Sequence, residues 1–103
     1  MATFRTNDNV EIYYEVSGQG APLFMLPGWT CTTRFWKHNV EELSRHFQVI
    51  CMDMRGHGES EKILHSHRIS RYAMDVKNLL DHLDLHDVTV LGWSMGASIL
   101  WSY

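Results

Sequence analysis

A serine flanked by two glycines is the pattern in this chain with the clearest chemical meaning. Gly92, Ser94 and Gly96 form a Gly-x-Ser-x-Gly pentapeptide that lies between a predicted strand and a predicted helix. A sharp turn at this point forces its central residue into an unfavourable backbone conformation, at a cost of about 1–3 kcal/mol, and exposes the side chain. Small residues at the two glycine positions relieve the crowding. The pattern predicts that Ser94 is a nucleophile.

Two backbone N–H groups are predicted to hold the oxyanion that forms when Ser94 attacks a carbonyl. The Met95 N–H lies in the first turn of the following helix, where donors are unpaired and the helix dipole is positive. The second candidate is the N–H of Trp29, in the glycine-containing loop after the apolar run 22–26. Removing one such donor typically costs about 2.7–4 kcal/mol of transition-state stabilisation. Trp93, beside the serine, is a candidate for the acyl pocket.

The hydrophobic pattern predicts which strands must position these groups. Residues 3–6 and the strand that follows them are predicted to form an N-terminal hairpin. In the second strand apolar and polar residues alternate, as in a strand with one buried face. Its apolar face holds Val10, Ile12, Tyr14 and Val16. Continuous apolar runs over 22–26, 47–52 and 88–91 are typical of strands that are covered on both faces.

Helices are predicted between these strands. Apolar residues recur at helical spacing from Thr32 or Thr33, the candidate N-caps, to about Arg45 or His46. The same spacing runs from Ile69 to Leu83, and residues 97–103 also look helical. Alternating strands and helices predict an α/β fold, with an N-terminal β-hairpin and parallel strands that carry helices on both faces.

Composition excludes several classes of protein. With 103 residues, 45% hydrophobic and 20% charged, the chain fits one globular domain and not a collagen, a coiled coil or a disordered segment. A net charge of −3 with scattered signs argues against nucleic-acid binding. No apolar stretch approaches the roughly 18 residues of a membrane span, and no signal peptide opens the chain, so we expect a cytoplasmic protein with no membrane partner. Cys31 and Cys51 are expected to be buried, reduced thiols.

Three motifs in order resemble the N-terminal part of an α/β-hydrolase fold protein, similar to small serine esterases and the non-haem haloperoxidase-like branch. They are Pro27-Gly28-Trp29, the run Asp53-x-Arg55-Gly56-His57-Gly58-x-Ser60, and the turn around Ser94. The resemblance covers the whole chain and implies that Ser94 is the nucleophile, that the Trp29 and Met95 amides form the oxyanion hole, and that the loop 53–60 is structural.

The chain departs from the family pattern at two points. Many members have His where it has Pro27, and a second Gly where it has Ala97, but neither change removes a backbone donor. A serine at the elbow argues against haloalkane dehalogenases, whose nucleophile is an aspartate.

Residues 1–103 hold only one member of a catalytic triad. In this fold the acid and the histidine follow the nucleophile along the chain, yet no Asp, Glu or His occurs between Met95 and Tyr103. We therefore expect residues 1–103 to be the N-terminal portion of a single domain that acts on a small ester or acyl substrate and is nearly inactive alone. Its partner would be the remaining C-terminal half, or a second copy, at the open sheet edge formed by 88–91. The alternative is a non-catalytic module that pairs through that edge.

Other polar residues suggest less well supported chemistry. His57 precedes Ser94 and lies in the loop that the resemblance makes structural, so it is not the expected base. Asp53 is expected to cap that loop and to pair with Arg55. Two polar stretches contain residue types that bind zinc: His65-Ser66-His67, and the set His82, Asp84, His86 and Asp87. Neither stretch completes a set of ligands at the spacing of a zinc site, so no metal or cofactor is expected.

Overall fold

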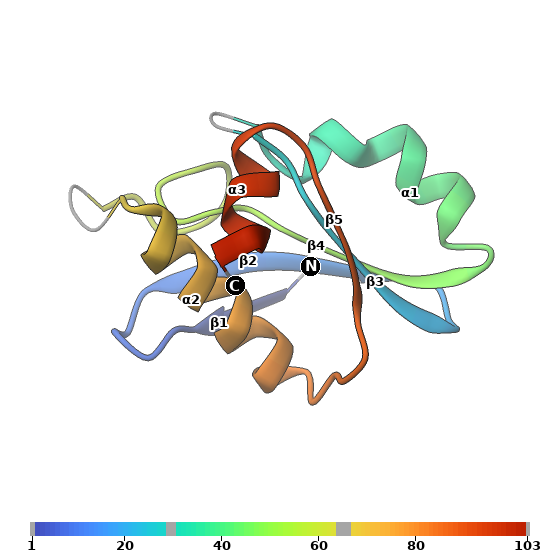
Figure 1. Ribbon diagram of the computed structural model, residues 1–103, viewed down its shortest axis with the longest axis horizontal. Helices are drawn as coiled ribbons and strands as arrows, with labels where there is room; N and C mark the ends of the chain where they lie inside the picture. Colours follow the sequence, from blue (N-terminus) through green and yellow to red (C-terminus); the bar gives the residue numbers. More distant parts are fainter. Residues whose placement is uncertain (1, 29–30, 64–66, 103) are drawn as a thin grey trace.

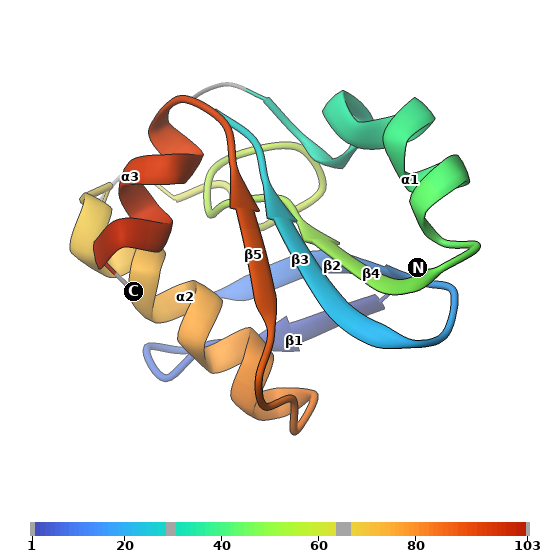
Figure 2. The same ribbon diagram turned by 45° about the vertical axis from the view of Figure 1, so that its right-hand side comes forward.

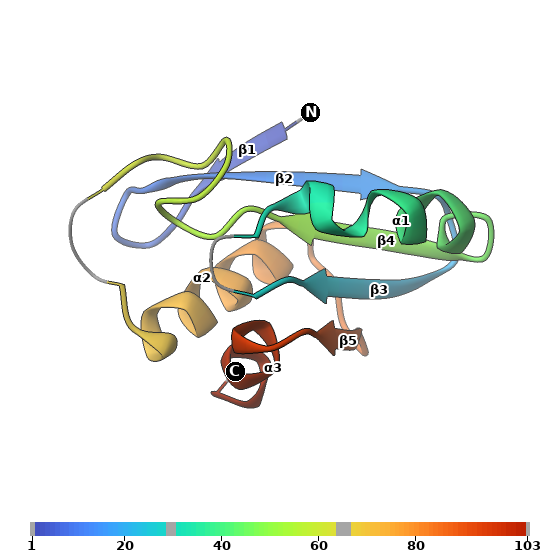
Figure 3. The same ribbon diagram turned by 90° about the horizontal axis from the view of Figure 1, so that it is seen from above.

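The strands form one mixed sheet. The computed structural model describes residues 2–28, 31–63 and 67–102, and five strands in that part of the chain lie in the order β1-β2-β4-β3-β5 (Figure 3). β1 pairs with β2, and β2 with β4, in antiparallel fashion, whereas β3 is parallel to both β4 and β5. The strands are β1 (Ala2–Arg5), β2 (Glu11–Ser17), β3 (Ala21–Leu26), β4 (Phe47–Met52) and β5 (Thr89–Gly92). The predicted hairpin and parallel strands are confirmed.

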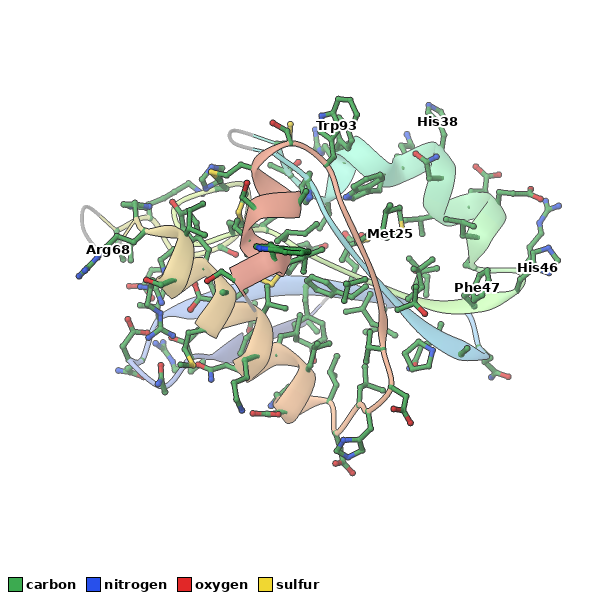
Figure 4. The ribbon with its side chains drawn as sticks, in the orientation of Figure 1. Met25, His38, His46, Phe47, Arg68 and Trp93 are labelled. Atoms are coloured by element: carbon green, nitrogen blue, oxygen red, sulfur yellow. The ribbon has the colours of Figure 1, made fainter. Side chains whose placement is uncertain are left out.

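Helices cover both faces of this sheet, as the pattern predicted (Figures 1 and 2). A 3₁₀ turn, η1 (Thr33–Trp36), and α1 (Lys37–Leu43) lie on one face, and α2 (Ile69–His82) and α3 (Met95–Ser102) lie on the other. Successive residues of β3 point to opposite faces. Met25 therefore packs with Trp36 between the sheet and α1 (Figure 4), whereas Phe24 packs in the larger core beneath α2 and α3.

The predicted boundaries of two helices differ from those of the structure. Thr32 is the N-cap, and its side chain accepts a hydrogen bond from the Arg34 N–H, but the first turn is 3₁₀ and the α-helix ends at Leu43 rather than near His46. α3 begins at Met95, two residues before the expected start, because the serine turn leads directly into the helix. None of the helices in the described ranges has the length and apolar character needed to cross a bilayer.

The alternation predicted for β2 is only partly correct. Ile12 and Tyr14 face the core as expected, but Val16 is 40% exposed. Tyr14 already contacts His82, the last residue of α2, so Val16 lies beyond the end of that helix. On the opposite face Tyr13 is buried beneath the loops that follow β3 and β4, and its hydroxyl donates to Glu15.

A buried ion-pair network holds the loop after β4. The guanidinium of Arg55, fully buried, donates to Asp75 of α2 at 2.7 Å and to Asp8 of the β1–β2 turn at 3.0 Å. Burial acts to lower the pKa of Arg55, but these hydrogen bonds outweigh it and raise the pKa. The expectation that Arg55 pairs with Asp53 is wrong, because the fold brings two other carboxylates to the guanidinium. The network ties the N-terminal hairpin, the loop and α2 together.

Candidate active site

Ser94 occupies the strained turn that its sequence context predicts. It joins β5 to α3, its side chain is exposed, and its φ is 56°. Such a left-handed conformation is uncommon for any residue with a Cβ atom and persists only where the surrounding structure holds it. The strand, turn and helix around Ser94 are therefore those of a nucleophile elbow.

The two flanking glycines are required by contact with neighbouring backbone. A Cβ atom at Gly96 would lie 2.3 Å from the carbonyl oxygen of Leu26, and one at Gly92 would lie 2.6 Å from the nitrogen of Ala97. Both distances are shorter than any stable contact. The Trp93 N–H also donates to the Leu26 carbonyl at 3.1 Å. The end of β3 and the serine turn are thus locked together at the carboxyl edge of the sheet.

The loop after β3 reaches Ser94 at Gly28. A Cβ atom at this buried glycine would lie 3.1 Å from Ser94 Cβ and 3.5 Å from its Oγ, so only the bare backbone fits without displacing the serine. Trp29, predicted to supply an oxyanion amide, lies outside the described residues. The N–H of Met95 lies at the start of α3, and no acceptor for it occurs among the described residues. Positive potential at this helix end favours a developing negative charge.

A buried aspartate joins this loop to the next one. Asp53, directly after β4, accepts hydrogen bonds from the Thr33 N–H at 2.7 Å and the Glu59 N–H at 2.8 Å. Its capping role in the loop 53–60 is confirmed by the second bond. The first bond, to Thr33 at the end of the loop that follows β3, had no signal in the sequence, because it joins residues from separate connections.

An aromatic pair lies beside the serine turn. Trp93 projects from the end of β5 (Figure 4) and stacks on Phe35 of η1, with ring centroids 6.2 Å apart and planes 26° apart. Trp93 is 58% exposed, and Phe35 also meets Trp36 edge-on at 4.9 Å. Sequence reasoning named Trp93 but missed Phe35, whose contact is made only by folding.

Two histidines considered from the sequence, His57 as a general base and His67 as a metal ligand, make hydrogen-bond contacts away from Ser94. Nδ1 of His57, which is buried, lies 3.0 Å from the Arg55 carbonyl oxygen of its own loop. His67 lies against the Ile63 carbonyl and the Tyr72 hydroxyl, each at 2.9 Å. No cluster of three or more metal-ligating side chains occurs within residues 2–28, 31–63 and 67–102.

Comparison with known proteins places this geometry in context. Residues 21–103 match the family model described as alpha/beta hydrolase fold. The chain is 35% identical over 99 residues to a non-heme chloroperoxidase of Kitasatospora aureofaciens, an alignment that covers 95% of this chain and 36% of that protein. It is 34% identical over 92 residues to a soluble epoxide hydrolase of a Corynebacterium, an alignment that covers 89% of this chain and 32% of that protein. An esterase structure from Exiguobacterium antarcticum superposes with a TM-score of 0.95 at 30% identity, covering 99% of this chain and 38% of that one. The chain thus spans about a third of the length of these relatives.

Proposed function

Since the chain belongs to the alpha/beta hydrolase fold family, we propose that it forms the N-terminal portion of a single serine hydrolase domain. The substrate is a small carboxylic ester or a related acyl compound, such as a lactone or a peracid. The observation that carries the proposal is the backbone of Ser94, whose φ of 56° presents an exposed hydroxyl at the turn between β5 and α3.

The proposed reaction is acyl transfer in two steps. Ser94 Oγ attacks the substrate carbonyl, and the proton of the hydroxyl passes to a histidine base. The amides of Met95 and Trp29 hold the oxyanion, and collapse of the tetrahedral intermediate expels the alcohol and leaves an ester on Ser94. Water then releases the acid by the same route. The base and its acid would come from outside residues 1–103, because none follows Ser94 here.

Among the relatives, the name of the esterase supports this class of chemistry, whereas the other two names describe different reactions, so the substrate is left to experiment. They comprise a chloroperoxidase, an epoxide hydrolase and an esterase. These three activities can be separated with a panel of substrates. The panel contains short-chain aryl esters, lactones, peracetic acid with halide, and a terminal epoxide. We expect ester or lactone hydrolysis to exceed epoxide opening, because a serine alkoxide forms an acyl-enzyme readily with a carbonyl.

Labelling with a fluorophosphonate probe tests the nucleophile. In the protein that carries this chain at its natural length, Ser94→Ala should abolish labelling and reduce ester hydrolysis to the residual level, roughly 10³- to 10⁴-fold over water, that binding and the oxyanion hole supply. Ser98→Ala, at an exposed serine on the same helix, is the matched control and should label normally. Undiminished labelling of the Ser94 variant would end the assignment.

A second candidate function is supported by the free edge of β5. In the described part of the chain β5 pairs with β3 alone, and Val90 and Leu91 are 40% and 43% exposed. An apolar, unpaired edge is a template for another strand. We propose as the second function a non-catalytic module, in which this edge pairs with a second copy of the chain or docks a complementary chain. In the serine hydrolase the same edge would instead pair with the remaining C-terminal half of the domain.

Mixing experiments distinguish the two functions. A polypeptide of residues 1–103 should be nearly inactive alone, and it should gain esterase activity when a polypeptide carrying the rest of the domain is added. A stable, inert homodimer on size exclusion would favour the pairing module. The cytoplasmic location expected from the sequence remains a prediction that cell fractionation can check.

A further inference from the structure

Asp53 is a buried carboxylate that accepts hydrogen bonds from two separate loops. It is 1% exposed, and its two oxygens are divided between them: Oδ1 accepts from the Thr33 N–H at 2.7 Å and Oδ2 from the Glu59 N–H at 2.8 Å. Among the described residues no lysine or arginine forms an ion pair with it. A buried charge is tolerated only where its surroundings satisfy it. Here backbone amides satisfy the charge, so Asp53 and the two loops depend on each other.

The surrounding backbone is shaped to hold this carboxylate in place. Asp53 itself is fixed, because its N–H donates to the Tyr13 carbonyl and its carbonyl accepts from the Ser60 hydroxyl. Gly58, with φ of 50°, approaches so closely that a Cβ atom would lie 2.1 Å from Oδ2. The side chain therefore cannot move away from Thr33 without disturbing several neighbours.

The loop held by Asp53 is the one that meets Ser94. It leaves β3 after Leu26, touches Ser94 at Gly28, turns through a hydrogen bond from the Cys31 N–H to the Gly28 carbonyl at 3.1 Å, and ends at Thr33. One end is held by the serine turn and the other by Asp53. The position of the loop relative to Ser94 thus depends on both attachments.

We propose that Asp53 is a positioning residue for the proposed oxyanion hole: through the Thr33 N–H, its carboxylate holds residues 31–33, and through the Cys31–Gly28 hydrogen bond it sets the place of Gly28 against Ser94. The inference rests on the proposed function for its catalytic consequence. Its structural part, that Asp53 holds the loop, stands independently. In this role Asp53 acts through the loop rather than on the substrate.

Asp53→Asn is the sharpest variant, because it keeps the shape of the side chain and replaces one acceptor oxygen with an amide donor. That donor must face either the Thr33 or the Glu59 N–H, so one hydrogen bond is lost. Misplacing a catalytic group by about 1 Å can cost 10²-fold in rate. We expect kcat for an activated ester to fall about 10- to 100-fold with KM changed less than about threefold, because donors to the oxyanion act in the transition state.

Asp8→Asn is the matched control. Asp8 likewise accepts hydrogen bonds, from the Arg55 guanidinium and the Thr6 hydroxyl, but it lies in the β1–β2 turn, and its hydrogen-bond partners among the described residues include neither Gly28, Thr33 nor Ser94. A merely structural role for Asp53 predicts that both variants lose stability and that neither changes kcat. A positioning role predicts that only Asp53→Asn lowers kcat at a temperature where both remain folded.

Hydrogen exchange gives a readout that does not require activity. In Asp53→Asn of the full-length protein, the Cys31 and Thr33 amides should exchange at least about tenfold faster, whereas Leu79 and Leu80 of α2 keep their wild-type protection. Wild-type kcat in Asp53→Asn would overturn the inference. If the parent protein hydrolyses no ester, the proposed function fails, and exchange decides alone: unchanged protection of Cys31 and Thr33 would overturn the inference as well.

Discussion

Gly28 packs directly against Ser94, and a Cβ atom at Gly28 would lie 3.1 Å from Ser94 Cβ and 3.5 Å from Oγ. The contact joins two segments that the sequence separates widely, the loop after β3 and the turn after β5. It is close enough that the serine, or the loop, must shift by a few tenths of an ångström to admit one methyl group. The geometry of the candidate nucleophile is therefore sensitive to the smallest possible change at Gly28.

Gly28→Ala tests this sensitivity. We expect the rate of fluorophosphonate labelling at Ser94 to fall about tenfold, because small displacements of a reacting group carry large kinetic costs. The free energy of unfolding should fall by no more than about 1 kcal/mol, since the misfit is slight. Urea unfolding and labelling rates measure the two effects. Wild-type labelling would show that Gly28 does not constrain the serine.

Ser94→Gly and Ser94→Ala should differ in stability although both remove the nucleophile. Alanine keeps the unfavourable φ of 56°, whereas glycine adopts it freely. We expect Ser94→Gly to be about 1 kcal/mol more stable than Ser94→Ala, which is the order of the strain at such a position. Urea denaturation of the two variants checks this. Equal stability would mean that the turn relaxes without the serine.

Protonation of Asp8 should lower the free energy of unfolding of the protein in acid. Its hydrogen bonds to Arg55, and then one from Thr6, hold the pKa of Asp8 well below its usual range. In the unfolded chain that pKa returns to about 3.9, so below this pH the unfolded state binds more protons and stability decreases as pH falls. The stabilisation is fully present above about pH 5 and is lost progressively as the pH falls below that value.

Asp8→Asn is expected to flatten this acid dependence. The free energy of unfolding, measured in urea from about pH 5 to about pH 2, should decrease less steeply in the variant than in the parent protein. Above about pH 5 the variant should be less stable by a nearly constant amount. Parallel curves across the whole range would contradict the coupling between Asp8 and Arg55.

The two cysteines should differ in reactivity. Cys51 is buried between the sheet and α1, and burial, followed by the nearby charges of Glu15 and Asp53, raises the pKa of its thiol to about 12. Cys31 is partly exposed, so the expectation that both thiols are buried is wrong for this residue. At about pH 8 a thiol reagent should modify Cys31 and leave Cys51 intact until urea unfolds the protein. Cys31→Ser should then be unreactive when folded, and rapid modification of that variant would show that Cys51 is accessible.

Local sequence determined the order of elements and the place of the nucleophile turn. The continuous apolar runs of β3, β4 and β5 and the helical spacing of α2 are set by neighbours within each segment, and Gly92, Ser94 and Gly96 mark the turn by their spacing alone. Thr32 could be recognised as a cap for the same reason. These features depend on contacts between residues a few positions apart.

Tertiary structure decided which side chains meet. The bond from Thr33 to Asp53, the pairing of Arg55 with Asp75 and the stacking of Phe35 on Trp93 join segments brought together by the parallel crossovers of the sheet. Val16 is exposed, against the prediction, because α2 ends at His82. A one-dimensional pattern records the periodicity of a segment, whereas these contacts depend on where each crossover places the next segment against the sheet.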